Sequence, residues 1–397
     1  MIRALLVLML GAFVSQTTEY LPIGLLSRIA ADLRVSHAAV GSLVTGYAWI
    51  ITLTVIPLTL STNRIDRRPL FLVLLGIITL CNGLALITHS WGQLMGLRIV
   101  AALGHGVFWS SLASYAVRIA PSMAASRATA WVFSGISLAI VAGVPLSTAL
   151  GQAFDWQQGF AIFGAFGLII LIMGYFWLPP MAVAARGEGA GFPHRNWPLY
   201  GAAAVTLLII TAHFNGYTYI TPLVTETLGM RGARLPLALL VFGLAGAAGT
   251  LLAGWLGPRP MRLAVVSAIG IVISQLLMLC FAGLPGISWL VMALWGASIA
   301  MLIIGLQSWV IVLAPGQAEA ASALYVMTFN IGIGAGAMSG GIWMDHYGAQ
   351  TLLLAGAGLG IIAVASFLLP PYWQKTGRKP AGEISQRKAG NTAENRE

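Results

Sequence analysis

Long apolar stretches separated by short polar joints run along almost the whole chain. An α-helix needs about 20 mostly apolar residues to cross the hydrocarbon core of a bilayer. The pattern therefore predicts an all-α membrane protein with twelve transmembrane helices. Their expected ranges are 4–26, 38–61, 69–88, 92–117, 127–150, 158–179, 198–223, 233–256, 262–283, 287–313, 319–343 and 350–371.

The two halves of the chain repeat one sequence pattern. Segment 119–155 opens with Ile-Ala-Pro and ends with Gly-x-x-x-Asp, and segment 313–345 opens with Leu-Ala-Pro and ends in the same way. The offset between the two copies drifts from 194 to 190 residues. Internal duplication of membrane helices is typical of transporters, in which the substrate binds near the midplane between the repeats.

The longest joint inside the chain divides the predicted helices into six and six. We expect two pseudo-symmetric six-helix bundles at 1–179 and 198–371, a cytoplasmic linker at 180–197, and a disordered cytoplasmic tail at 372–397. The apolar start has no small-residue cleavage site and continues to Leu26, which predicts a first spanning helix that is not removed.

Composition supports a membrane protein, with 58% apolar and 8% charged residues. An ordinary soluble domain carries about 25% charged residues. The net charge of +10 does not indicate nucleic-acid binding, because the basic residues lie in short joints and in the tail. Most of them fall on one side when both termini are placed in the cytoplasm, as the positive-inside rule requires.

Glu19 is the only carboxylate deep inside a predicted span. Ionisable residues at this depth usually face a cavity or pair with another group. Because burial favours the neutral form of a carboxyl, Glu19 is a candidate proton carrier. The alternative is a structural hydrogen bond or ion pair with a neighbouring helix.

Two histidines inside spans are further candidates for proton coupling. His105 shares a helix face with Trp109 and with Arg98, whose role stays open between function and structure. His213 lies one helical turn before Tyr217, so both can face a cavity together. For each histidine the alternative is a packing or interhelical hydrogen bond.

The sequence resembles the major facilitator superfamily, in particular its drug/proton antiporter branch. Six plus six helices, a basic loop with Arg67 and Arg68, and a Gly/Pro-rich fifth span with Gly143 and Pro145 carry this resemblance. Small residues allow close helix approach and proline weakens a helix, which suits a gating or packing role for these four residues. The loop departs from the superfamily pattern, since Asn63 stands where an Asp is usual.

Within that branch the chain is most similar to bacterial sugar efflux transporters, over stretches 17–26, 47–49, 67–68, 104–110, 211–213 and 329–337. This resemblance implies a bacterial inner-membrane antiporter that exports small sugars or glycoside analogues in exchange for protons. Candidate substrate-binding residues carry an aromatic ring or an amide, namely Tyr20, Tyr47, Trp49, Trp109, Tyr217, Gln307 and Asn330. The alternatives are a multidrug/proton antiporter and a nucleoside or amino-acid exporter.

The remaining chemistry is sparse. No metal-ligand cluster, nucleophile–base arrangement or nucleotide fold is recognisable, so we expect neither an enzyme nor a cofactor or metal. The glycines at 332–341 lack the Lys-Ser/Thr that follows a phosphate loop, and they indicate helix packing instead. The expected partners are a small-molecule substrate, protons and the lipid bilayer, and we expect a monomer.

Overall fold

A computed structural model describes residues 1–368 except 63–64, 124, 181–195, 257–258, 282–283 and 315–317. These residues are almost entirely helical. The longer elements are α1 (Ile2–Gly24), α3 (His37–Thr62), α4 (Arg67–Leu84), α5 (Trp91–Ile119), α6 (Ala125–Leu138), α7 (Val144–Ala153), α8 (Trp156–Trp177), α9 (Trp197–Tyr217), α11 (Arg234–Leu256), α12 (Pro260–Cys280), α13 (Pro285–Leu313) and α14 (Ala318–Leu368). Short elements are α2 (Leu26–Leu33), α10 (Ile220–Glu226), the 3-10 turn η1 (Ala85–Ile87) and the π-helical turn η2 (Ala139–Gly143).

Each of the twelve predicted ranges contains helix in the structure. By length and apolar composition alone, ten segments of the described residues are able to cross a membrane. Helix α5 is not among them, and α14 counts once as the stretch Ala321–Phe367. However, α14 breaks at Gly348, whose φ of 80° lies in a region that favours glycine, so its two arms correspond to the last two predicted spans.

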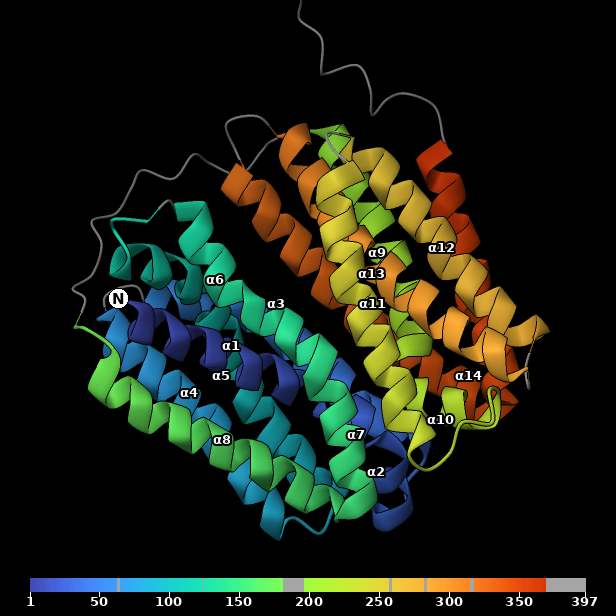
Figure 1. The fold of residues 1–397 in the computed structure, drawn as a ribbon, viewed down its shortest axis with the longest axis horizontal. Helices are drawn as coiled ribbons and strands as arrows, with labels where there is room; N and C mark the ends of the chain where they lie inside the picture. Colours follow the sequence, from blue (N-terminus) through green and yellow to red (C-terminus); the bar gives the residue numbers. More distant parts are fainter. Residues whose placement is uncertain are drawn as a thin grey trace, which may run out of the picture.

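The helices form two groups that lie side by side, α1–α8 in blue to green and α9–α14 in yellow-green to red (Figure 1). Within the first group α3 packs on α5 and α4 on α8, and within the second α9 packs on α14 and α11 on α13. The arrangement follows the predicted division of the chain, although the domain limits stay a prediction. The linker at 181–195 and the tail at 372–397 lie outside the described residues.

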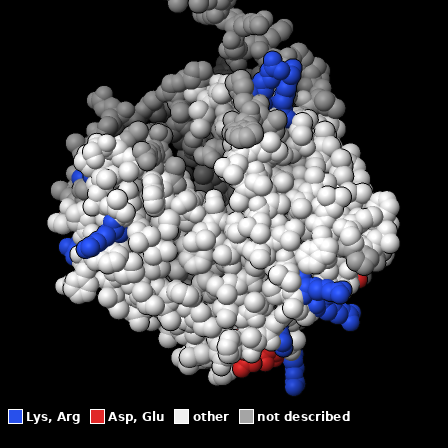
Figure 2. Space-filling view, viewed as in Figure 1, with Lys and Arg blue, Asp and Glu red and all other residues white. Residues whose placement is uncertain are grey.

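The two groups meet along α3 with α14 and along α7 and η2 with α11. Near the start of α3, the backbone N–H of Ala38 donates to both carboxylate oxygens of Asp345 at 3.3 and 3.2 Å. Thr45 donates to the carbonyl of Gly334 further along the same contact, at 3.1 Å. Figure 2 shows a hollow between the two groups at the other end of the molecule.

The surface fits a bilayer. In Figure 2 the charged side chains gather toward two opposite ends, and a broad belt between them carries none. Large apolar side chains are exposed on helices of both groups, for example Leu53, Phe176 and Leu251. Such an apolar exterior is stable where lipid, and not water, surrounds the protein.

Two local distortions shape the interior. Pro22 lies inside α1, and a proline cannot donate to the carbonyl four residues earlier, which here belongs to Thr18. The fifth span contains η2 directly before Pro145, and π-turns of this kind are frequent at functional sites. Gly143 lets this turn approach α1, because a Cβ there would lie 2.9 Å from Cγ2 of Thr17 and would overlap its hydroxyl.

Candidate functional site

Glu19 and His105 form a buried pair within the first group of helices. Oε2 of Glu19 on α1 lies 3.4 Å from Nε2 of His105 on α5, and both side chains are less than a tenth exposed. Gln16, one turn earlier on α1, donates its Nε2 to the same carboxylate oxygen at 2.7 Å. The α1 and α5 helices therefore bring together the carboxylate and the histidine that the sequence singled out.

The imidazole of His105 has partners at both nitrogens. The hydroxyls of Ser15 and Tyr47 lie 3.0 and 2.9 Å from Nδ1. The indole N–H of Trp109 donates to Nε2 at 2.7 Å. An indole can only donate, so Nε2 is an acceptor in this arrangement and the proton of the neutral ring belongs on Nδ1. Oε2 of Glu19 lies 3.4 Å from this acceptor nitrogen, and a proton on the carboxyl removes the repulsion between a carboxylate and the Nε2 lone pair.

Arg98 stabilises the part of α1 that carries Glu19. Its guanidinium donates to the carbonyls of Thr18 and Glu19, the latter at 2.8 Å, and it lies 3.9 Å from the ring centre of Tyr47. The Thr18 carbonyl is the one that Pro22 leaves without a helical donor. Arg98 is 2% exposed and, within the described part of the chain, has no carboxylate within 4 Å. Arg98 thus supplies the hydrogen-bond donor that α1 lacks at Thr18, and it places a positive charge beside the Glu19–His105 pair.

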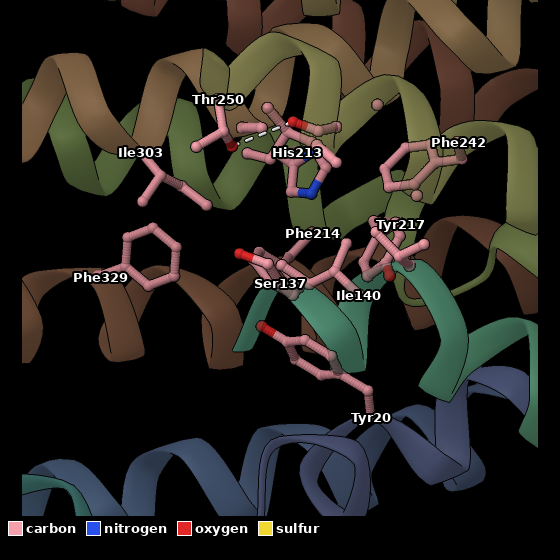
Figure 3. Close-up of a pocket in the computed structure, with 17 residues that line it drawn as sticks. Tyr20, Ser137, Ile140, His213, Phe214, Tyr217, Phe242, Thr250, Ile303 and Phe329 are labelled. Carbon is pink, nitrogen blue, oxygen red and sulfur yellow. Dashed lines mark hydrogen bonds between the residues drawn. The ribbon is translucent and has the colours of Figure 1, made fainter. Parts of the chain in front are cut away.

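A separate pocket lies between the two groups of helices (Figure 3). It is lined by Tyr20 of α1, by Ser137, Ile140 and Val141 of the fifth span, and by His213, Phe214, Tyr217, Phe242, Gly243, Gly246, Ala247, Thr250, Gly296, Ile299, Ala300, Ile303 and Phe329 of the second group. The cavity volume is about 60 Å³. Among the residues that the structure describes, the lining is largely apolar and aromatic, with hydroxyls and one imidazole but no Asp, Glu, Lys or Arg.

His213 and Tyr217 lie together on the pocket wall. Their rings stack with centroids 5.1 Å apart and planes 19° apart, and Tyr217 stacks in turn on Phe242 at 5.3 Å. The indole N–H of Trp295 on α13 donates to Nδ1 of His213 at 3.1 Å. Figure 3 shows Tyr20 reaching toward the same space from α1, on the side opposite His213.

Other candidates from the sequence lie elsewhere. Glu19, Tyr47 and Trp109 belong to the buried cluster and do not line the pocket. Trp49 lies at the contact between the groups, where its Nε1 is 3.5 Å from the carbonyl of Ile331. Asn330, on α14, uses its amide to donate to Val326 in its own helix at 3.0 Å.

Gln307 and the two loop arginines are also remote from the pocket. The Gln307 side chain is exposed on α13. Arg68 donates to the carbonyl of Tyr175 and lies 5.7 Å from the centre of its ring, a contact with α8 inside the first group of helices. Arg67 begins α4 beside it. Within the described ranges of the chain, neither arginine forms a hydrogen bond or an ion pair with the second group of helices.

The sequence reasoning missed several residues that complete the two sites. Gln16, Ser15 and Trp295 were not singled out, although each bonds a candidate residue directly. A signal for Gln16 existed, since it lies three residues before Glu19 and so on the same helix face. Trp295 is distant in sequence from His213, and nothing in the local pattern pairs them.

Comparisons with known proteins agree with this architecture. Residues 8–337 match the sequence profile of the Major Facilitator Superfamily. The chain belongs to the Major Facilitator Superfamily. It is therefore a multi-pass membrane protein of a transporter family, and the family resemblance predicted from the sequence is confirmed.

Members of the superfamily with similar sequences carry a common description. Proteins described as "probable sugar efflux transporter" are 34% identical in Helicobacter pylori (strain P12), over 89% of this chain and 92% of that one, and 35% identical in Pasteurella multocida (strain Pm70), over 91% and 90%. A protein of the same description in Mannheimia succiniciproducens is 34% identical over 96% of both chains.

Solved superfamily structures share the fold at low sequence identity. The nucleoside transporter NupG matches with a TM-score of 0.75 at 14% identity, over 92% of this chain and 99% of that one. A bacterial homologue of the human lysosomal transporter Spinster, in an inward-facing and occupied conformation, also matches with a TM-score of 0.75 at 14% identity, over 92% and 95%. This likeness supports the major facilitator fold.

Proposed function

We propose that the protein is a proton-coupled antiporter of the bacterial inner membrane that exports small sugars or glycosides. The single observation that carries the proposal is the buried Glu19–His105 contact of 3.4 Å, which involves the same helix, α1, that contributes Tyr20 to the pocket between the two groups of helices. Relatives described as sugar efflux transporters at about a third identity supply the substrate class. Both termini are placed in the cytoplasm by the distribution of Lys and Arg.

The proton is held between Glu19 and His105. With Nε2 of His105 accepting from Trp109, a proton on the Glu19 carboxyl removes the repulsion between a carboxylate and the Nε2 lone pair and keeps the pair neutral. Loss of that proton leaves a carboxylate in a site of low polarity, near the positive charge of Arg98. The protonated and the ionised forms of the Glu19 carboxyl therefore favour different arrangements of α1 against α5.

The link from this pair to the substrate runs along α1. Tyr20 follows Glu19 directly and lines the pocket, where its ring lies 6.3 Å from that of Tyr217. A shift of α1 on protonation therefore changes the pocket wall. A proton and a substrate that favour opposite states of one two-state protein drive exchange, because each ligand shifts the same equilibrium.

Substrate binds in the pocket between the groups. The hydroxyls of Tyr20, Ser137 and Thr250 offer hydrogen bonds, and the rings of Tyr217 and Phe242 offer flat surfaces. A sugar presents hydroxyls at its rim and C–H groups on its faces, which matches such a lining. The gate on the opposite side is the contact of α3 with α14, where Asp345 receives the N–H of Ala38.

A second candidate function is export of lipophilic drugs in exchange for protons. The largely apolar and aromatic lining of the pocket favours it. The absence of charged groups from that lining argues against cationic drugs, because a cation would lose its hydration without gaining a counter-charge. Competition between neutral glycosides and neutral lipophilic compounds for one transport activity separates the two candidates.

The test of proton coupling uses purified protein in proteoliposomes with an imposed pH gradient. We expect uphill transport of a radiolabelled glycoside to collapse when a protonophore is added. Glu19→Gln is expected to reduce uphill transport at least about 100-fold and to retain downhill exchange of the same sugar. The matched control is Glu226→Gln, whose carboxylate is exposed on α10. Undiminished uphill transport by Glu19→Gln contradicts the proposal.

A further inference from the structure

His213 has a fixed partner on one side of its ring. Trp295 donates its indole N–H to Nδ1 at 3.1 Å, and an indole N–H cannot reverse its role. Nδ1 therefore carries no proton, and the proton of the neutral imidazole lies on Nε2. The ring is 2% exposed, so this hydrogen bond is shielded from competition by water.

Aromatic contacts hold the ring in one orientation. Tyr217 stacks on one face, and Phe214 and Trp295 meet the ring edge to face with centroids 5.0 and 5.9 Å away. The hydrogen bond to Trp295 involves Nδ1 alone, and no acceptor for Nε2 is found among the described residues. Since His213 lines the pocket, its remaining N–H is a donor available there.

The surroundings give a positive charge on His213 nothing to pair with. The titratable groups that face the pocket with it are the hydroxyls of Tyr217 on its own helix and of Tyr20 on α1. Phe242 of α11 and Trp295 of α13 supply apolar rings. Glu19, the carboxylate at the position that matches His213 in the sequence repeat, contacts Gln16 and His105 instead.

We infer that His213 is a specificity-determining hydrogen-bond donor whose Nε2–H, fixed by Trp295, binds an acceptor oxygen of an uncharged substrate. This reassigns a residue first predicted to be a second proton carrier. Phe242 and Tyr217 border the donor, so the acceptor oxygen belongs next to an apolar face of the substrate. The inference rests on the proposed function in one respect, that this pocket is the substrate site.

The first test needs no ligand. The full chain is labelled with ¹⁵N only at its six histidines, and His213 is assigned from the spectrum of His213→Gln. We expect the Nε2–H tautomer to persist from about pH 5 to pH 8, and Trp295→Phe to give a mixture of tautomers. A His213 ring that takes up a proton within that range overturns the inference.

The second test uses p-nitrophenyl β-galactoside and analogues in which one hydroxyl at a time is replaced by hydrogen. His213→Phe is expected to weaken binding of the parent compound about tenfold. For the one analogue that lacks the partner oxygen, the same variant is expected to change nothing, and His213→Gln is expected to recover part of the parent's affinity. Equal losses for every analogue overturn the inference.

A third readout separates this inference from the proposed function. Proton flux per glycoside transported by His213→Phe, measured at saturating glycoside, is expected to equal that of the unaltered protein. Loss of coupling in this variant overturns the donor role. If the unaltered protein binds no glycoside while the histidine spectrum keeps the fixed tautomer, the sugar class of the proposed function is wrong and the donor role stands.

Discussion

Glu19 on α1 and His213 on α9 occupy matching places in the two groups of helices. They are 194 residues apart, the same offset that relates segment 119–121 to segment 313–315. Each lies near a bond between a histidine and an indole, His105 with Trp109 in one case and His213 with Trp295 in the other. The first site adds a carboxylate at 3.4 Å from its histidine, whereas the second adds stacked aromatic rings.

The difference shows how a duplicated scaffold separates two tasks. In the first group a carboxyl and an imidazole share one buried contact, and Arg98 holds the backbone beside them. In the second group the imidazole has no acidic partner among the described residues, and it lines the pocket. Under the proposed function, similar helix positions would thus support proton binding on one side and recognition of a neutral group on the other, because the neighbours differ.

The largest effect is expected from Arg98→Gln, which breaks only the first site. The carbonyl of Thr18 loses its donor, at a cost of about 2 kcal/mol in the free energy of unfolding. Transport is expected to fall about 100-fold, because a displaced α1 misplaces Glu19. Thermal unfolding and proteoliposome transport measure the two effects, with the exposed Arg231→Gln as control.

A double-mutant cycle sharpens this prediction. Pro22→Ala restores a backbone N–H that can reach the Thr18 carbonyl within α1. In that background the loss of stability caused by Arg98→Gln is expected to be smaller. An equal loss in both backgrounds would show that Arg98 does not compensate for Pro22.

A smaller effect, about tenfold on transport, is expected from Gly143→Ala. The added methyl group meets Thr17, two residues before Glu19, and pushes η2 away from α1. Gly76→Ala is the matched control, because a Cβ on this α4 glycine meets nothing within 4 Å. Transport rates and protein yield are compared for both variants, and equal transport by the two would remove the role assigned to this close approach.

The two indoles provide a direct comparison of the sites. Trp109→Phe removes the donor from which Nε2 of His105 accepts, so uphill transport is expected to fall about fivefold with little change in KM. Trp295→Phe is expected to leave the proton flux per glycoside unchanged and to raise KM about fivefold. A loss of coupling caused by Trp295→Phe, or no loss of uphill transport caused by Trp109→Phe, contradicts the division of tasks.

The smallest effects are expected from removing single hydroxyls. Tyr217→Phe keeps the stack on His213 and Phe242, and is expected to raise KM about threefold. Tyr47→Phe removes a hydroxyl 2.9 Å from Nδ1 of His105, and is expected to lower uphill transport about threefold without raising KM. The comparison of the two sites is contradicted if Tyr47→Phe raises KM and Tyr217→Phe leaves KM unchanged.

The helices of the fold were predictable because each needs only a run of apolar residues long enough for the bilayer. Every predicted range contains helix, and the break at Gly348 matches the expected joint between the last two spans. The irregular features of the helices were harder to predict from the sequence. The sequence indicated a weakened fifth span at Gly143 and Pro145, but the π-turn depends on packing against α1 that no local pattern encodes.

The site was predictable only in part. Helical spacing correctly placed His213 beside Tyr217 and Trp109 beside His105, because these residues are one turn apart. The spacing could not reveal that Glu19 faces α5 within its own group of helices, away from the lining of the pocket. Asn330 and Gln307 have suitable side chains, but the rotation of α14 and α13 directs them elsewhere.

The π-helical turn η2 contacts helices of both groups, α1 in the first and α11 in the second. Gly143 approaches Thr17 of α1, and the backbone at Val141 lies close to Gly243 of α11. One residue more or less in a helical turn rotates everything beyond it by about 100°. Converting η2 into an ordinary α-helical turn would therefore rotate α7 about its axis. The same change would alter the contact of η2 with α1, near Glu19, and its contact with α11 in the second group of helices.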